Sequence, residues 1–137
     1  MNRVVFACVQ NAGRSQMAAA FFNNEADRAK AVAISAGTAP GPRVHPEVVE
    51  VMREAGIDLS NARPRAFTPE IADEVTLLVT MGCGDTCPVA PGTETIDWPL
   101  PDPHGQPIAR VREIRDAIRD RVRGLLRERG WSRSDRV

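Results

Sequence analysis

The chain has 137 residues, a length that predicts one compact domain whose core needs no disulfide bonds for its stability. Its 18 basic and 18 acidic residues balance to a net charge of zero, so no overall field favours nucleic acid or a membrane surface as a partner. The apolar runs are far too short to span a bilayer, and the first strand begins too early for a secretory signal, so we expect a cytoplasmic protein.

The predicted elements alternate between strands and helices from the start of the chain. An apolar run predicts a strand over residues 3–7, followed by a helix over residues 14–27 and a second strand over residues 32–35. A strand, a helix and a strand in this order form a right-handed unit with parallel strands. After a proline-rich loop, a helix is expected to begin at Pro46 and to end at Gly56.

The second half of the chain continues this alternation. A short helix is expected from Pro69, with Thr68 as its cap. The apolar run over residues 75–81 predicts a strand covered on both faces, and residues 95–98 predict a weaker strand. Apolar side chains recur at helical spacing over residues 108–129, which predicts a long final helix. Such a chain forms an open parallel sheet with helices on its faces.

We expect one domain over residues 1–130 and a frayed C-terminal tail over residues 131–137. The final helix is rich in arginine, and a nucleic-acid surface is one interpretation of that charge. Interleaved acidic residues balance the arginines, in pairs such as Arg112 with Asp116. A solvated outer helix is therefore the better prediction.

The stretch between the first strand and the first helix carries the expected chemistry. Cys8 ends the strand, and Arg14 and Ser15 open the helix. A loop that leads into a helix N-terminus presents unpaired N–H groups to an anion, and the Arg14 guanidinium adds a planar fork for a tetrahedral oxyanion. The same positive field favours a thiolate at Cys8, to which Ser15 can donate a hydrogen bond. A merely buried cysteine is the alternative. The residues expected to hold the oxyanion are Val9, Gln10, Asn11, Ala12, Gly13 and Arg14.

Three chemically active side chains follow predicted strands. Ligands of open parallel sheets bind beyond the carboxyl ends of the strands. Cys8, Cys83 and Asp102 follow the first, third and fourth strands, so all three belong at the same edge of the sheet. Asp102 can protonate a leaving oxygen there. By itself, an aspartate between two prolines is more typical of a turn.

Cys83 and Cys87 form a second cysteine motif, in a glycine-rich loop with three residues between them. An odd total of three cysteines indicates reactive thiols rather than a disulfide framework. A zinc site is one alternative, but it needs two further ligands. A redox pair is the better interpretation, because one helical turn would bring both sulfurs to one side at nearly disulfide distance.

The motif Cys8-x5-Arg14-Ser15 resembles the loop of the low-molecular-weight protein tyrosine phosphatase superfamily, and the run from Arg14 to Ala18 resembles its arsenate reductase branch. The phosphatase branch usually has proline where this chain has Gln16, and often cysteine where it has Gly13. The resemblance covers about residues 3 to 128 and includes Ser35-Ala36-Gly37-Thr38, Asp58-Leu59-Ser60-Asn61, Val79-Thr80-Met81, Cys87-Pro88 and Asp102-Pro103. We therefore expect a flavodoxin-like three-layer α/β/α domain with a four-stranded parallel sheet in the order 2-1-3-4.

The resemblance implies reduction of arsenate to arsenite by a relay of three thiolates. Cys8 would attack arsenate, Asp102 would protonate the leaving oxygen, and Cys83 would expel arsenite by forming a disulfide with Cys8. Cys87 would then move the disulfide to the Cys83–Cys87 pair. No bound cofactor is implied, but an external thiol donor is required, and thioredoxin, glutaredoxin with glutathione, or mycothiol could each serve.

Two departures from the family pattern are visible. Cys83 and Cys87 lie closer together than the second and third cysteines of the best-known thioredoxin-coupled reductases. The family's cation site uses a glutamate where this chain has Ala19, so we expect no bound potassium or other metal. We also expect a monomer that binds neither nucleic acid nor a membrane.

Two rival functions remain open. A low-molecular-weight phosphatase would act on phosphotyrosine or a small phosphoester, but the Cys83–Cys87 pair, the absence of tyrosine and the presence of Gln16 argue against it. A non-catalytic arsenic-responsive protein would use its thiols to trap arsenite. Turnover with a thiol donor in excess separates this second rival from an enzyme.

Overall fold

The structure is a computed structural model that describes residues 1–82 and 87–133. Four strands form one parallel sheet in the order β2-β1-β3-β4, which confirms the predicted order. Strand β1 lies inside the sheet and pairs with both β2 and β3. The strands are β1 (Asn2–Cys8), β2 (Ala31–Gly37), β3 (Leu77–Thr80) and β4 (Glu94–Asp97).

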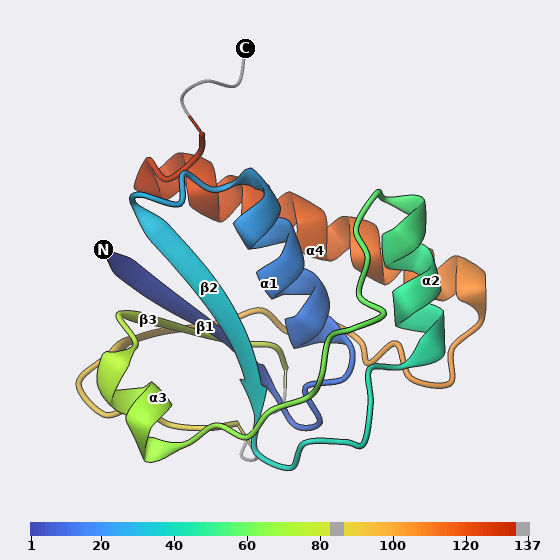
Figure 1. The fold of residues 1–137 in the computed structure, drawn as a ribbon, viewed down its shortest axis with the longest axis horizontal. Coiled ribbons are helices and arrows are strands. Elements are labelled where there is room, and N and C mark those ends of the chain that lie inside the picture. Colours follow the sequence, from blue (N-terminus) through green and yellow to red (C-terminus); the bar gives the residue numbers. More distant parts are fainter. Residues whose placement is uncertain (83–86, 134–137) are drawn as a thin grey trace.

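Helices cover both faces of the sheet, as expected of a three-layer α/β/α domain (Figure 1). The helices α1 (Arg14–Glu25), α2 (Pro46–Glu54) and α4 (Ile108–Arg129) lie on one side, and α3 (Pro69–Glu74) lies on the other. Thr68 caps α3 as predicted, because its hydroxyl accepts the N–H of Ile71 at 3.3 Å.

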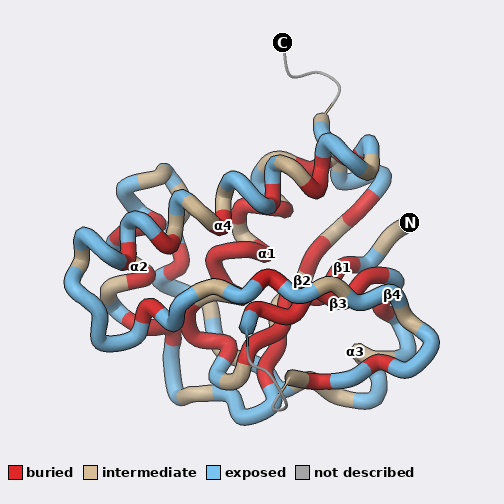
Figure 2. The backbone as a smooth tube through the Cα atoms, turned by 180° about the vertical axis from the view of Figure 1, so that it is seen from behind, coloured by how far each residue is buried: buried red, intermediate tan, exposed pale blue. Residues whose placement is uncertain are grey.

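The main core lies between the sheet and α1. Figure 2 shows α1 buried along most of its length, unlike the outer helices, which alternate between buried and exposed residues. Phe6 of β1 packs edge-on against Phe22 of α1, with ring centroids 5.9 Å apart, and also contacts Trp98 at 5.7 Å. This packing holds β1 and α1 together, and so helps to position the loop that connects them.

The predicted frayed tail is wrong for residues 131–133. Trp131 is only 8 % exposed, and its ring packs edge-on against Phe22, with centroids 6.1 Å apart. The backbone carbonyl of Trp131 also accepts the N–H of Asp27 at 2.7 Å. The chain after α4 is thus held against the end of α1 by apolar burial and by backbone hydrogen bonds.

The arginines of α4 form more ion pairs with acidic residues of other elements than with acidic residues of α4 itself. Arg112 and Arg115 both bond Glu54 of α2, with the closest contacts at 2.8 and 3.0 Å. The expected pair of Arg112 with Asp116 is wrong, because Asp116 pairs with Arg115 at 2.9 Å. These bridges help to orient α4, although exposed ion pairs contribute little free energy. Among the described residues, no helix is long and apolar enough to cross a membrane.

Candidate active site

Residues 8–15, named here the anion loop, connect the end of β1 to the first turn of α1. Every carbonyl group of residues 8–13 accepts a hydrogen bond from a residue outside the loop, so these carbonyls point away from the loop's concave side. A segment that follows β2 supplies four of the donors. The N–H of Thr38 bonds the carbonyl of Cys8 at 3.4 Å, and the N–H of Ala39 bonds that of Val9 at 2.9 Å. The N–H of Gly41 bonds the carbonyl of Gln10 and the N–H of His45 bonds that of Ala12, each at 2.9 Å. The other two are Gln16 Nε2 to Asn11 O at 3.0 Å and Met17 N–H to Gly13 O at 3.1 Å.

This outward turn of the carbonyls decides where the amides point. A trans peptide group directs its C=O and its N–H in opposite directions, so the N–H groups of residues 9–14 turn toward the concave side. None of them has a hydrogen-bond partner among the residues that the structure describes. Together with the N-terminus of α1, they form a site for an anion.

Gly37 allows the segment after β2 to lie this close to the anion loop. Its backbone pairs with Cys8 in the β1–β2 register. A Cβ atom at this position would collide with the carbonyl oxygen of Val9 and would lie 3.0 Å from the Asn11 N–H nitrogen. Only a residue without a side chain fits here. Through Gly37, the end of β2 lies directly against the anion loop.

Below the anion loop, a chain of polar contacts leads to the cysteine. Ser15 Oγ lies 2.9 Å from Cys8 Sγ and accepts a hydrogen bond from Asn11 Nδ2 at 2.7 Å. Asn11 adopts a left-handed conformation with φ of 52°, and its side-chain oxygen accepts the N–H of Arg65 at 2.9 Å. Gln16 Nε2 joins Asn11 O to Arg63 O, at 3.0 and 3.2 Å. Cys8 itself is buried and forms no disulfide bond.

Arg14 is anchored by one nitrogen of its guanidinium group. Nη1 donates to the carbonyl oxygens of Met81 and Leu100 at 2.7 and 2.8 Å, so it is bound to the chain after β3 and to the chain after β4. The Nε and Nη2 groups have no partner among the described residues. A guanidinium held in this way can offer two parallel N–H groups to one oxyanion.

A pocket of about 200 Å³ occupies the concave side of the anion loop. Asp102 reaches it from the proline-rich segment after β4, where its carboxylate accepts the N–H of His104 at 3.0 Å. Gly13 brings this segment close, because a Cβ there would lie 2.9 Å from Pro103 Cγ. The pocket is lined by Cys8, Val9, Gln10, Ala12, Gly13, Arg14, His45 and Asp102.

The pocket gathers most of the residues that the sequence assigned to oxyanion binding, together with Cys8 and Asp102. Asn11 and Ser15 do not line it; both are fully buried and act on the loop and the sulfur from behind. Cys83 lies outside the described residues. Cys87 is described but does not line the pocket. The catalytic roles of these residues stay predictions.

His45 is the pocket residue that sequence motifs did not single out. It directly precedes Pro46 at the start of α2, and only 9 % of the residue is exposed. Its ring lies 4.2 Å from the ring of His104, measured between centroids. Burial lowers the pKa of His45, the nearby His104 lowers it further, and the charges of Glu47 and Asp102 raise it.

Asp97 is a second residue that the sequence did not single out. Its carboxylate accepts the Thr80 hydroxyl at 2.6 Å and the Gly82 N–H at 3.1 Å. These bonds tie the end of β4 to the start of the segment that carries Cys83. Among the described residues, no three His, Cys, Asp or Glu side chains gather as a metal site would require.

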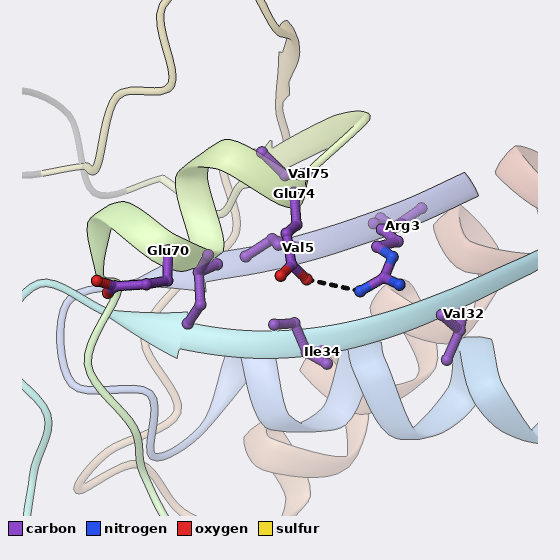
Figure 3. Close-up of a pocket in the computed structure, with 9 residues that line it drawn as sticks. Arg3, Val5, Val32, Ile34, Glu70, Glu74 and Val75 are labelled. Carbon is purple, nitrogen blue, oxygen red and sulfur yellow. Dashed lines mark hydrogen bonds and ion pairs between the residues drawn. The ribbon is translucent and has the colours of Figure 1, made fainter. Parts of the chain in front are cut away.

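A second pocket, of about 140 Å³, lies between α3 and the sheet (Figure 3), and Cys8 does not line it. Valine and isoleucine side chains of β1 and β2 form much of its wall. Arg3 and Glu74 form an ion pair of 2.6 Å at this pocket. No cysteine, serine, threonine or histidine lines this pocket, and Arg3 and Glu74 are paired with each other, so it is not the candidate active site.

Comparison with known proteins places this site in a family. Residues 3–132 match the family described as "Low molecular weight phosphotyrosine protein phosphatase". The chain is 44 % identical to a "Putative arsenate reductase" of Halobacterium salinarum, over 90 % of this chain and 89 % of the relative. It is 33 % identical to the "Glutaredoxin arsenate reductase" of a Synechocystis strain, over 92 % and 97 % of the two chains.

A solved structure agrees with these matches. The thioredoxin-dependent arsenate reductase of Corynebacterium glutamicum superposes with a TM-score of 0.78 and 37 % identity over 93 % of this chain. This chain spans 61 % of the length of that protein. With the sequence match, the parallel sheet and the anion loop in agreement, the chain belongs to the low molecular weight phosphotyrosine protein phosphatase family.

Proposed function

We propose that this protein is an arsenate reductase that converts arsenate to arsenite with Cys8 as its nucleophile. The observation that carries the proposal is the position of Cys8. Its unbridged sulfur lines a pocket of about 200 Å³, next to backbone N–H groups that have no partner among the described residues. The relatives named as arsenate reductases, and the Cys83–Cys87 pair in the sequence, favour reduction over simple hydrolysis.

The first chemical step uses the residues of the pocket. The loop amides and Arg14 hold arsenate while the Cys8 thiolate attacks arsenic and forms an S–As bond. An As–O bond breaks, and Asp102 gives its proton to the leaving oxygen, which departs as water. The Ser15 hydroxyl stabilises the thiolate before the attack.

The reduction itself is a thiolate exchange. The Cys83 thiolate attacks Cys8 Sγ, an S–S bond forms, and the pair of electrons of the broken S–As bond stays on arsenic, which is reduced from As(V) to As(III) and leaves as arsenite. Cys87 then attacks Cys83 and frees Cys8. An external donor, one dithiol or two molecules of a monothiol, supplies two electrons that reduce the Cys83–Cys87 disulfide and restore the starting thiols.

The donor of electrons is a protein of the thioredoxin or glutaredoxin type, or the small thiol mycothiol. The Corynebacterium structure is named as thioredoxin-dependent, and the Synechocystis relative carries glutaredoxin in its name. Both names fit a disulfide that must be reduced from outside the pocket. The proposal takes the protein to be a cytoplasmic monomer.

The test is steady-state formation of arsenite from arsenate with each donor system in turn. The expected result is turnover with at least one donor, and none for Cys8→Ser with the same donor. Absence of arsenite with every donor, from a protein that hydrolyses an aryl phosphate, would replace the proposal with a phosphatase.

Phosphatase activity is the second candidate, and the family match favours it specifically. Cys8, Arg14 and Asp102 line the same pocket, and these three residues suffice for the transfer of a phosphoryl group to a thiolate and its hydrolysis. We expect weak hydrolysis of aryl phosphates that is independent of thiol donors.

A further inference from the structure

His45 contacts the anion loop through its backbone and lines the pocket with its side chain. Its backbone N–H bonds the carbonyl of Ala12 in the anion loop at 2.9 Å, so the start of α2 is fixed against the loop. Its imidazole forms part of the pocket wall, together with Cys8 and Arg14. Any oxyanion in a pocket of about 200 Å³ therefore lies near this ring.

The imidazole is buried, yet its nitrogens have no hydrogen-bond partner among the described residues. Its neighbour His104 approaches ring against ring, at 4.2 Å between centroids and 33° between planes, which leaves the ring nitrogens of His45 unbonded. Among the described residues, every side-chain nitrogen or oxygen that is sealed from solvent has a hydrogen-bond partner. The unpartnered nitrogens of His45 are therefore not sealed from solvent, and the ring lines the pocket. They are open to a group that enters the pocket.

The surroundings of His45 shift its pKa in opposite directions. Its pKa is below the ordinary value, chiefly because burial disfavours the charged ring and also because His104 is near. A bound oxyanion adds negative charge beside the ring and favours its protonated form. The titratable and charged groups that face or neighbour His45 are Glu47 of its own helix, His104 and Asp102 of the segment after β4, and Cys8 and Arg14 across the pocket.

We propose that His45 is a substrate-binding residue, which takes up a proton when an oxyanion enters the pocket and donates a hydrogen bond to one of its oxygens. The inference rests on the proposed function only in naming arsenate as that oxyanion. The proton comes from solvent on binding. It returns to solvent after reduction, because arsenous acid is uncharged at neutral pH and no longer favours the imidazolium form.

The test is calorimetry of inorganic phosphate binding at pH 8, where phosphate is already a dianion, in two buffers with different ionisation enthalpies. The difference between the buffers gives the protons taken up per phosphate bound. We expect the wild type to take up protons when phosphate binds, and His45→Gln to lose the part of that uptake that comes from His45. The phosphate affinity of His45→Gln should also be about ten-fold lower, the value of a hydrogen bond to a charged group. His104→Gln is the matched control and should retain the uptake.

Two further variants keep the result interpretable. His45→Asn removes the titrating ring but places a favourable cap at the start of α2, so it should behave as His45→Gln does with the helix preserved. Cys8→Ser removes the thiol, and the proton uptake that belongs to His45 should persist in it. Uptake in His45→Gln equal to that of the wild type would overturn the inference.

The experiment is independent of arsenate reduction. If the wild type shows uptake that depends on His45 but reduces no arsenate, the inference stands and the proposed function fails. If arsenate is reduced and His45→Gln retains the full uptake, the proposed function stands and His45 is part of the wall only.

Discussion

Ser15 Oγ lies 2.9 Å from Cys8 Sγ, and the contact has a defined direction. The side-chain NH2 group of Asn11 can only donate, and it does so to Ser15 Oγ at 2.7 Å. The hydroxyl therefore accepts on that side and keeps its own hydrogen for the sulfur. A hydroxyl that donates to sulfur stabilises the thiolate more than the thiol.

The first prediction follows from this direction. Ser15→Ala should slow the alkylation of Cys8 at mildly acidic pH by about ten-fold, the value of one hydrogen bond to a charged group. Mass spectrometry of labelled peptides measures the rate at each cysteine. In the wild type, Cys8 should be labelled first and should be protected by phosphate or arsenate. Preferential labelling of Cys87, unaffected by either oxyanion, would remove Cys8 from its role.

The second prediction concerns Arg14. In the wild type, the planar guanidinium binds the carbonyls of Met81 and Leu100 and still has two N–H groups for the oxyanion. Arg14→Lys keeps the positive charge but loses this planar group. Turnover of arsenate should fall by roughly 100-fold, as for the loss of an oxyanion donor, with the fold intact. Arg110→Lys, on the exposed side of α4, is the matched control and should turn over normally. Near-normal turnover of Arg14→Lys would show that the oxyanion is held without it.

The third prediction concerns Gly37. Gly37→Ala forces a methyl group against the Val9 carbonyl and the Asn11 backbone, so it should cost about 1–3 kcal/mol of stability and weaken phosphate binding. The measurements are chemical denaturation and phosphate titration. Gly124→Ala is the control, because open space surrounds that position in α4 and alanine favours a helix by about 0.5–1 kcal/mol. Unchanged phosphate affinity in Gly37→Ala would mean that the loop does not depend on this close approach.

The fourth prediction concerns the docked C-terminal segment. Trp131→Ala removes a ring that is 8 % exposed and should lower the free energy of unfolding by about 3 kcal/mol. Val89→Ala, at a position 74 % exposed, should change it by less than about 0.5 kcal/mol. Equal stability of the two variants, measured by chemical denaturation, would mean that residues 131–133 are not part of the folded domain.

The sequence predicted what depends on local pattern. The apolar runs located the strands, and Thr68, Pro69 and Gly130 marked helix ends that the structure places at the same residues. The anion loop was visible because Cys8 and Arg14 have a fixed spacing that the loop itself requires.

Long-range packing was out of reach of the same patterns. Trp131 follows a helix stop in a polar segment, and its burial comes from Phe22, which lies 109 positions earlier in the sequence. His45 reaches the pocket through a backbone bond to Ala12 and through contact with His104, and no spacing rule connects these positions. Arg112 pairs with Glu54 because α2 lies beside α4 in the fold.

The central claim is that three thiols act in sequence, and single turnover in the Cys87→Ser and Cys83→Ser variants tests it most directly. The measurement is arsenite released per enzyme, with the disulfides of the product mapped by mass spectrometry. Cys83→Ser should release no arsenite with a thioredoxin system, and its weak aryl phosphate hydrolysis should survive. Cys87→Ser should release about one arsenite per enzyme and then stop with a Cys8–Cys83 disulfide, because the donor cannot reach a sulfur buried below the anion loop. Normal steady-state turnover of Cys87→Ser with thioredoxin would contradict the relay.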